Sequence, residues 1–350
     1  MRPAHSRARG FRRVLLRVIS VPAAGLAIRG LVVDVLVTPD EWAAELRQEA
    51  RDGLTASPKR LSPTWLYDDV GCALFERITR LPEYYPTRRE RSILRRHAAE
   101  VAGLSGADTL VEIGSGASDK TRLLLDALFA TGHLTRFVPF DIALPTLTGA
   151  ARSVASAYAG VTVHAVAGDF RRHVGAIPTR GRRMFAFLGG TIGNLVPAAR
   201  RSFLRDLAAA MAPGDTFLVG TDLVKDRDRL VAAYDDAAGV TAAFDKNVLV
   251  VLNRELGADF DPDGFDHVAR FDEGHEWIEM RVRAWSAQTV TVRELGLVAG
   301  FEAGEDLITE VSTKFRIAGL RTELASAALE PVTTWTDPDG DFALTLAVRR

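Results

Sequence analysis

Residues 109–121 read TLVEIGSGASDKT, and this stretch decides the fold that the sequence predicts. Thr109 to Ile113 is a short, mostly apolar run with β-branched residues, which is typical of a buried parallel strand. The Gly-Ser-Gly sequence at 114–116 follows as a turn that only small residues form tightly. From Lys120 to Ala130 apolar residues recur at helical spacing. In a strand–turn–helix of this kind, a nucleotide-like ligand meets the backbone amides at the helix N-terminus.

The glycine spacing in this turn distinguishes between two kinds of ligand. The dinucleotide pattern GxGxxG is broken, because Asp119 stands where the third glycine belongs. The pattern that begins at Glu112, Glu-x-Gly-x-Gly, fits better with S-adenosylmethionine, an adenosyl cofactor that has no pyrophosphate. A glycine turn between a strand and a helix is also a common simple connection, so the turn alone leaves both interpretations open.

Acidic residues follow two of the strands expected after the turn. These strands are 136–140, 161–166, 184–188 and 215–220. Asp141 ends the first of them, where an acid can accept hydrogen bonds from both ribose hydroxyls. Asp169 follows the second and can accept from an adenine amine, while Phe170 packs on the ring. Each acid alone is an ordinary strand-end residue. Together they lie along one carboxyl edge, where parallel sheets bind ligands, and they favour a bound cofactor.

The composition is that of an ordinary soluble globular protein. The 350 residues predict one large domain or two intertwined domains, and the formal charge of −1 gives no basic excess for nucleic acid. The single cysteine, Cys72, excludes an internal disulfide and a cysteine-clustered zinc site, and it suits a reducing cytoplasm. The seven histidines show no metal-ligand spacing, so we expect a metal-free protein.

The first 35 residues differ from the rest of the chain. Seven arginines precede the first acid, Asp34. The longest uncharged run, Val18 to Ile28, has 11 residues and contains Pro22, whereas a membrane-spanning helix needs about 20. Arg17 interrupts the apolar core that a signal peptide would need. We therefore expect residues 1–35 to be a disordered basic extension without a membrane span.

Two regions outside the strand–helix alternation indicate a second domain. A helix is expected from Pro39, and Pro58 to Glu90 is rich in proline and aromatic residues. The aromatic stretch fits either a lid or a pocket wall whose tyrosine hydroxyls bind a polar ligand. Beyond Lys225, helical segments at 227–244 and 248–256 precede strand-like alternation at 276–292 and 306–315, and a last strand is expected at 342–348. A sheet that is interrupted and then resumed predicts an inserted α+β domain.

Six segments, taken in order, carry a resemblance to one family. They are PKRLSPTWLYDDVGCALFERITRLPEYYPTRRE (58–90), VEIGSGASDKTRLLL (111–125), FLGGTIGNL (187–195), GTDLVKD (220–226), AYDDAAGVTAAFDKNVL (233–249) and LITEVSTKFR (307–316). They resemble the histidine-specific N-α-methyltransferases of ergothioneine biosynthesis, which convert histidine to hercynine. The resemblance runs from about residue 40 to residue 349.

The resemblance implies an architecture, a reaction and a set of site residues. It implies a Rossmann-like S-adenosylmethionine-dependent methyltransferase core, 88–224 and 315–350, with an inserted α+β substrate-binding domain, 36–87 and 225–314. It implies a monomeric cytoplasmic enzyme that binds L-histidine and its mono- and dimethylated forms. The implied cofactor contacts are Gly114, Lys120, Asp141, Asp169 and Phe170. The implied substrate contacts are Tyr84 and Tyr234 for the carboxylate, Asn194 for the α-amino group, Tyr67 near that amine through water, and Glu310 and Ser312 for the imidazole. Tyr67 and Asn194 are also the residues expected to assist the chemistry.

The spacing of Glu310 and Ser312 is chemically reasonable for that role. Alternate residues of a strand share a face, so both side chains point together while Val311 points away. A carboxylate and a hydroxyl can satisfy the one N–H and the one bare nitrogen of neutral imidazole. Without the resemblance, the same pair would be read as part of a solvated strand face.

The sequence disfavours three other functions. A methyltransferase of this family that acts on another aromatic amino acid, such as tryptophan, is disfavoured by the polar pair Glu310 and Ser312. A nicotinamide oxidoreductase is disfavoured by the broken GxGxxG pattern. A non-catalytic binding module is disfavoured because both the cofactor and the substrate positions are filled.

Overall fold

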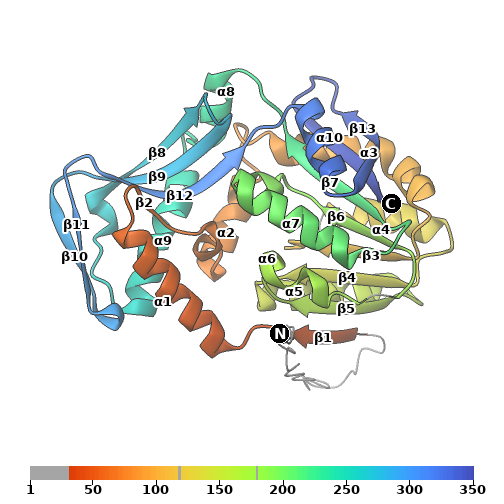
Figure 1. The fold of residues 1–350 in the computed structure, drawn as a ribbon, viewed down its shortest axis with the longest axis horizontal. Coiled ribbons are helices and arrows are strands. Elements are labelled where there is room, and N and C mark those ends of the chain that lie inside the picture. Colours follow the sequence, from red (N-terminus) through yellow and green to blue (C-terminus); the bar gives the residue numbers. More distant parts are fainter. Residues whose placement is uncertain (1–30, 117–119, 179) are drawn as a thin grey trace, which may run out of the picture.

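The computed structural model describes residues 31–116, 120–178 and 180–350. Its largest element is an eight-stranded sheet in the order β1-β5-β4-β3-β6-β7-β14-β13 (Figure 1). The parallel strands expected from the sequence are β3 (Thr109–Ile113), β4 (Arg136–Asp141), β5 (Thr162–Ala167), β6 (Arg183–Phe187) and β7 (Thr216–Asp222). Strand β3 lies between β4 and β6 in parallel register and is buried along its whole length. The predicted α/β fold with a parallel-rich sheet is confirmed.

Helices cover both faces of this sheet, because side chains of successive strand residues point to opposite faces. One hydrophobic cluster joins Leu110 of β3 to the first group of helices, and another joins Val111 to the second group. The first group comprises α3 (Pro86–Ser105), α4 (Thr121–Ala130) and α5 (Leu144–Ala157). The second group comprises α7 (Pro197–Ala210) and α10 (Ile317–Ser326).

The two ends of the described chain complete the sheet. At one edge, β14 (Phe342–Arg349) pairs antiparallel with β7, and β13 (Leu329–Thr336) pairs with β14. At the other edge, β1 (Leu31–Val35) pairs in parallel with β5, and Oδ2 of Asp34 lies 2.8 Å from Nε2 of His164. The prediction that residues 1–35 are disordered is therefore wrong for 31–35, where the β-branched run LVVDV extends the sheet. Residues 1–30 lie outside the described residues.

A second sheet lies beside the first, in the order β2-β12-β9-β8. Its strands are β2 (Lys59–Arg60), β8 (Phe265–Asp272), β9 (Trp277–Ala284) and β12 (Asp306–Thr313). A separate hairpin, β10 (Gln288–Val292) and β11 (Leu297–Phe301), adjoins it. The strands expected at 276–292 and 306–315 are present, whereas β8, β11 and β13 were not predicted.

Helices from the parts of the chain that supply this second sheet also pack on it. They are α1 (Pro39–Thr55), α2 (Asp69–Ile78), α8 (Arg227–Ala232) and α9 (Val240–Leu256). The helix expected at 227–244 is divided, because Gly239 takes a φ of +67° between α8 and α9. A third hydrophobic cluster is made only from residues within 46–85 and 230–307, so this region has its own core.

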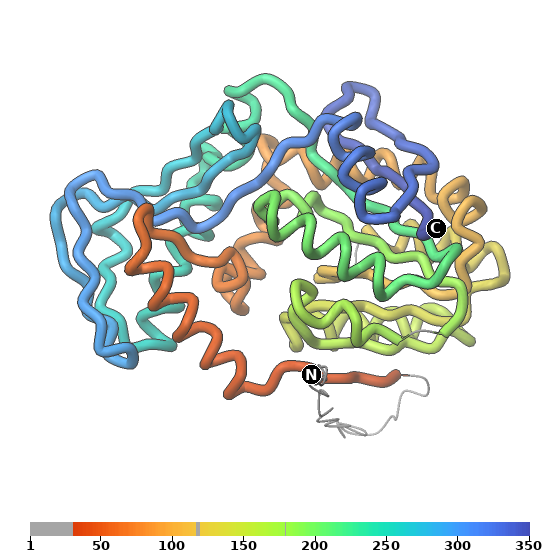
Figure 2. The backbone as a smooth tube through the Cα atoms, in the orientation of Figure 1, coloured from red at the N-terminus to blue at the C-terminus, as the bar shows by residue number. Residues whose placement is uncertain are grey.

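The chain passes repeatedly between the two sheets (Figure 2). It leaves the large sheet after β1 to form α1 and returns through α3. It leaves again after β7 and returns along β12 into α10. Strand β12 thereby reaches the 3₁₀ turn Thr191–Asn194 that follows β6, where the Asn194 side-chain amide donates to the carbonyl of Val311 at 3.0 Å. Among the described residues, no helix is long and apolar enough to cross a membrane.

Candidate active site

A cavity lies where the second sheet meets the strand ends of the large sheet. Its wall combines aromatic rings with a few polar side chains, a lining typical of small-molecule sites. All six residues predicted to contact substrate line it: Tyr67, Tyr84, Asn194, Tyr234, Glu310 and Ser312. They come from sequence positions more than 200 residues apart, so the fold brings together side chains that the sequence separates.

Aromatic packing fixes the tyrosines of the cavity. The ring of Tyr67 stands edge-on to Phe75 and Phe244, with centroid distances of 5.6 and 5.3 Å. The ring of Tyr84 stands edge-on to Tyr234 at 6.0 Å. Burial raises the pKa of all three tyrosines well above the usual value for a phenol. Each therefore stays protonated and offers a hydroxyl rather than a phenolate.

Glu310 is the carboxyl group at the other side of the cavity. It is buried, and its Oε2 atom has no hydrogen-bond partner among the described residues. Burial raises its pKa to about 8; nearby Asp245 adds to the rise, while Asn194 and Lys314 act against it. A buried acid in this state gains free energy when a ligand supplies a hydrogen-bond partner, because the unpaired group costs about 1–3 kcal/mol.

Ser312 and Tyr234 belong to a network that the sequence analysis missed. Their hydroxyl oxygens are 2.8 Å apart, and the ammonium of Lys314 donates to both, at 2.9 and 2.8 Å respectively. Lys314 is 1% exposed and also pairs with Oδ2 of Asp222 at 3.0 Å. Asp222 in turn accepts from the hydroxyl of Tyr85 at 2.9 Å.

Asp222 could have been found by the reasoning that found Asp141. It is the last residue of β7, in the motif GTDLVKD, and it lines the cavity. Acids at the carboxyl ends of parallel strands lie at the ligand-binding edge. Lys314 gave no such signal, because a lysine near a strand end is ordinarily solvent-exposed.

A buried pair behind the cavity supports Tyr234 and β12. Nδ1 of His267 lies 2.7 Å from Oδ2 of Asp245, and Nε2 lies 2.8 Å from the backbone carbonyl of Tyr234. Both partners are acceptors, so both ring nitrogens carry protons. Burial acts to lower the pKa of His267, but the hydrogen bond to Asp245 raises it overall. Asp245 also accepts from the hydroxyl of Thr309, which fixes the strand next to Glu310.

The glycine turn after β3 lies next to the predicted ribose acceptor. Gly114 and Gly116 take φ values of +67° and +47°, which favour glycine strongly. The N–H of Gly116 donates to Oδ2 of Asp141 at 2.8 Å, and the N–H of Ala143 donates to Oδ1 at 2.9 Å. Burial raises the pKa of Asp141, although these backbone donors act in the opposite direction. A carboxyl group held against a glycine turn fits a nucleoside ribose.

Lys120 connects the glycine turn to the substrate cavity. Its ammonium pairs with the fully buried carboxylate of Glu90. The same carboxylate accepts from the N–H of Gly189, at 2.8 and 3.0 Å to its two oxygens, and Gly189 lines the cavity. Glu90 was not identified from the sequence, because nothing in a helical ERSIL segment distinguishes it.

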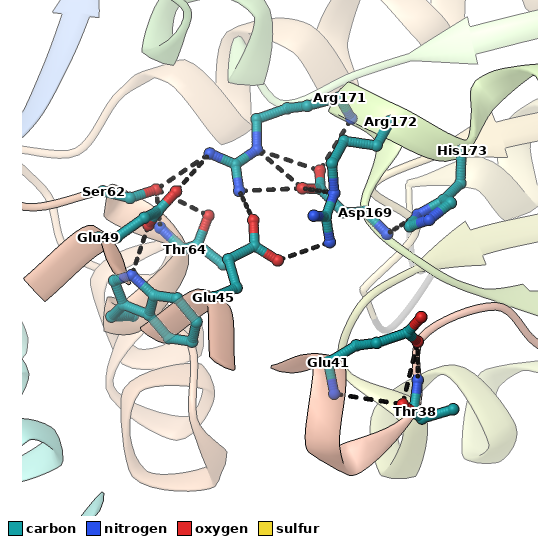
Figure 3. Close-up of polar contacts among 11 residues, drawn as sticks. Thr38, Glu41, Glu45, Glu49, Ser62, Thr64, Asp169, Arg171, Arg172 and His173 are labelled. Atoms are coloured by element: carbon teal, nitrogen blue, oxygen red, sulfur yellow. Dashed lines mark hydrogen bonds and ion pairs between the residues drawn. The ribbon is translucent and has the colours of Figure 1, made fainter. Parts of the chain in front are cut away.

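Asp169 takes part in a larger ionic network (Figure 3). Its carboxylate accepts from Nε of Arg171 at 3.0 Å, and the guanidinium extends to Glu45, at 3.3 Å, and Glu49, at 3.4 Å, on α1. The network thus joins the large sheet to the second region. Phe170 packs edge-on against phenylalanine rings of the core. The position of both residues is compatible with an adenine site, and in this structure the carboxylate of Asp169 is paired with arginine.

A cluster of three acids elsewhere is already paired with arginine. Asp337, Asp339 and Asp341 lie close enough together to hold a metal ion. Arg89 pairs with all three of them, and Arg229 pairs with Asp341. These contacts tie α3 and α8 to the β13–β14 hairpin, so we assign the cluster a structural role.

These features define an α/β protein with a glycine turn and a strand-end acid suited to a nucleoside-like cofactor, beside a cavity lined by polar side chains. Residues 46–349 match the family described as histidine-specific, SAM-dependent methyltransferases, and the chain belongs to that family. The glycine turn and Asp141 are the described residues that fit its adenosyl cofactor.

Relatives of known function are similar over most of the chain. A histidine N-α-methyltransferase of Mycolicibacterium smegmatis is 56% identical over 89% of this chain and 97% of its own length. One of Mycobacterium tuberculosis is 56% identical over 87% of this chain and 95% of its own length. Ergothioneine biosynthesis protein 1 of Neurospora crassa is 35% identical over 57% of this chain and 23% of its own length.

Proposed function

We propose that this enzyme transfers methyl groups from S-adenosylmethionine to the α-amino group of L-histidine until hercynine is formed, as the first step of ergothioneine biosynthesis. The observation that carries this proposal is the buried, unpartnered Oε2 of Glu310, which shares a cavity with Ser312. An apolar ring would leave this carboxyl group unpaired, whereas imidazole can satisfy it. The family membership and the named relatives support the same substrate.

The cavity supplies a partner for each polar part of histidine. Glu310 and Ser312 suit the two ring nitrogens. The hydroxyls of Tyr84 and Tyr234 suit the carboxylate, since both tyrosines remain protonated donors. The amide of Asn194 suits the α-amino group, because its nitrogen is already engaged by Val311 and its oxygen can accept.

The chain's own residues position the amine and remove its proton. The cofactor supplies a methyl group activated by its sulfonium. The amine must be neutral to attack, which costs about 1.4 kcal/mol for each pH unit by which its pKa exceeds the pH. Tyr67 keeps its proton, so water held by its hydroxyl, rather than the tyrosine itself, would accept the proton. The neutral amide of Asn194 tolerates a nitrogen that becomes bulkier and finally permanently charged.

The two regions of the fold have different roles in this proposal. We propose that 88–224 and 315–350 form the methyltransferase domain and that 36–87 and 225–314 form the substrate-binding domain. Separate sheets and separate hydrophobic clusters support this division. Residues 31–35 add to the methyltransferase sheet.

We also propose a monomer that acts in the cytoplasm on histidine and on its mono- and dimethylated forms. The free thiol of Cys72 suits a reducing compartment. All six predicted substrate contacts come from one chain, so a second copy is not needed to complete the cavity.

The test is an unbiased substrate competition. The protein is incubated with S-adenosylmethionine and all twenty standard amino acids in equal amounts, and the products are read by mass. We expect histidine to gain three methyl groups while tryptophan stays unmodified. Methylation of tryptophan in preference to histidine would support the alternative substrate, and no methylation of any amino acid would contradict the proposal.

A further inference from the structure

The cavity contains no cation to balance a ligand carboxylate. Among the described residues that line it, none is lysine or arginine; the ionisable ones are Asp222, Glu310 and tyrosines. A carboxylate moved from water into such a site loses several kcal/mol of solvation unless it is paired. Neutral hydroxyls alone compensate only part of this loss, and a cation behind the cavity wall would compensate more of it.

Lys314 is the buried cation behind that wall. Its ammonium lies under the ring of Tyr234, 4.4 Å from the ring centroid, and its three N–H groups meet three acceptors: Tyr234, Ser312 and Asp222. Asp222 is shared with Lys225, whose ammonium lies 2.5 Å from Oδ1. Asp222 therefore has a second cation, and Lys314 is the one that donates directly to the hydroxyls at the cavity.

Hydrogen-bond direction links Lys314 to the ligand. An ammonium only donates, so the oxygens of Tyr234 and Ser312 both accept from it. One of the two hydroxyl protons is used between them, because the oxygens are 2.8 Å apart. A single hydroxyl proton therefore remains for the ligand. A carboxylate can only accept, so it selects the arrangement in which Ser312 donates to Tyr234 and Tyr234 donates into the cavity.

We propose that Lys314 is a positioning residue for the substrate carboxylate and acts through the hydroxyl of Tyr234. This inference rests on the proposed function, in which an amino-acid carboxylate faces Tyr234. Lys314 supplies the counter-charge and polarises the hydroxyl that touches the ligand. The same arrangement turns the Ser312 oxygen toward the ring as an acceptor.

The experiment compares L-histidine with L-histidinamide, in which an uncharged amide replaces the carboxylate. Lys314→Met removes the charge and keeps the length of the side chain. We expect KM for histidine to rise roughly ten- to a hundredfold, as for the loss of hydrogen bonds to a charged group, and KM for histidinamide to change far less. Lys225→Met is the matched control: it removes the other cation of Asp222, which contacts Tyr85 instead of Tyr234. Its effect on the histidine-to-histidinamide ratio should be much smaller.

Three results would overturn the inference. The first is an unchanged KM for histidine in a folded Lys314→Met enzyme, and the second is an equal rise in KM for both substrates, which indicates only a structural role. If Lys314→Met does not fold, Tyr234→Phe is the deciding variant, because it removes the hydroxyl through which Lys314 is proposed to act. An unchanged ratio of the KM values for histidine and histidinamide in Tyr234→Phe is the third result. Parental enzyme that does not methylate histidine contradicts the proposed function itself, so the two failures are distinguishable.

Discussion

Glu310→Gln should remove a loss of folding stability that the ligand-free enzyme undergoes as the pH rises. The unperturbed pKa of this carboxyl is 4.5, and burial raises it to about 8 in the folded state. The folded protein therefore holds a proton that the unfolded chain releases, so its stability is full below about pH 4.5 and falls as the pH rises toward 8. At about 1.4 kcal/mol for each pH unit by which the pKa moves, the loss has an upper bound of about 5 kcal/mol. Glutamine is neutral at every pH and keeps the shape.

The assay is urea unfolding of both proteins from about pH 5 to about pH 9, without ligands. We expect the variant to become progressively more stable than the parent as the pH rises, by about 2–5 kcal/mol at the alkaline end. Glu305→Gln is the control, because this partly buried acid lies just before β12 and its pKa is lowered rather than raised. A stability difference between parent and Glu310→Gln that stays constant across the range would refute the reasoning.

Three further predictions concern the cofactor, the first strand and substrate choice. Asp141→Ala should weaken S-adenosylmethionine binding by about 1.5–3 kcal/mol in calorimetry; unchanged affinity would remove Asp141 from the site. Deleting residues 1–30 should leave activity and the thermal midpoint unchanged, whereas deleting 1–35 removes β1 from the sheet and should lower the midpoint; equal midpoints would show that β1 adds no stability. Replacing Glu310 and Ser312 together by apolar residues should narrow the preference for histidine over tryptophan in a competition assay, because the cavity then lacks the buried polar pair that tryptophan would leave unpaired. An unaltered rate and ratio would place selectivity elsewhere.

Local sequence patterns predicted the parts of the fold that local physics controls. The central strand at 109–113 and the strands at 136–141 and 342–349 follow from short, mostly apolar runs. Strand β1 was missed because LVVDV follows an arginine-rich stretch, and its pairing with β5, more than 100 residues away, is invisible in the local pattern. Strand β8 carries polar residues such as Asp266 and Arg270 among apolar ones, so its alternation was weak.

In the candidate site, too, some residues were predicted from the sequence and others were not. The six substrate contacts taken from the family resemblance line one cavity, but the charges behind them could not be predicted from the sequence. Lys314 looks like an ordinary surface lysine until the fold places Asp222, Tyr234 and Ser312 around its ammonium. His267 is a single histidine without metal-ligand spacing, and its role depends on Asp245, which precedes it by 22 residues on a different element. Such networks depend on tertiary contacts between residues far apart in the chain, and a single sequence does not show which residues make these contacts.

The carboxylate of Glu90 bridges the glycine turn and the substrate cavity. One of its contacts is Lys120, beside the glycine turn, and another is the backbone of Gly189, at the substrate cavity. A cofactor that drew Lys120 away would leave a fully buried anion with only backbone donors, at a cost of several kcal/mol. A cofactor that changed the affinity for the amino acid through this bridge would have its own affinity changed by the amino acid by the same factor. Binding measured for either ligand alone would then differ from binding in the ternary complex by one shared factor.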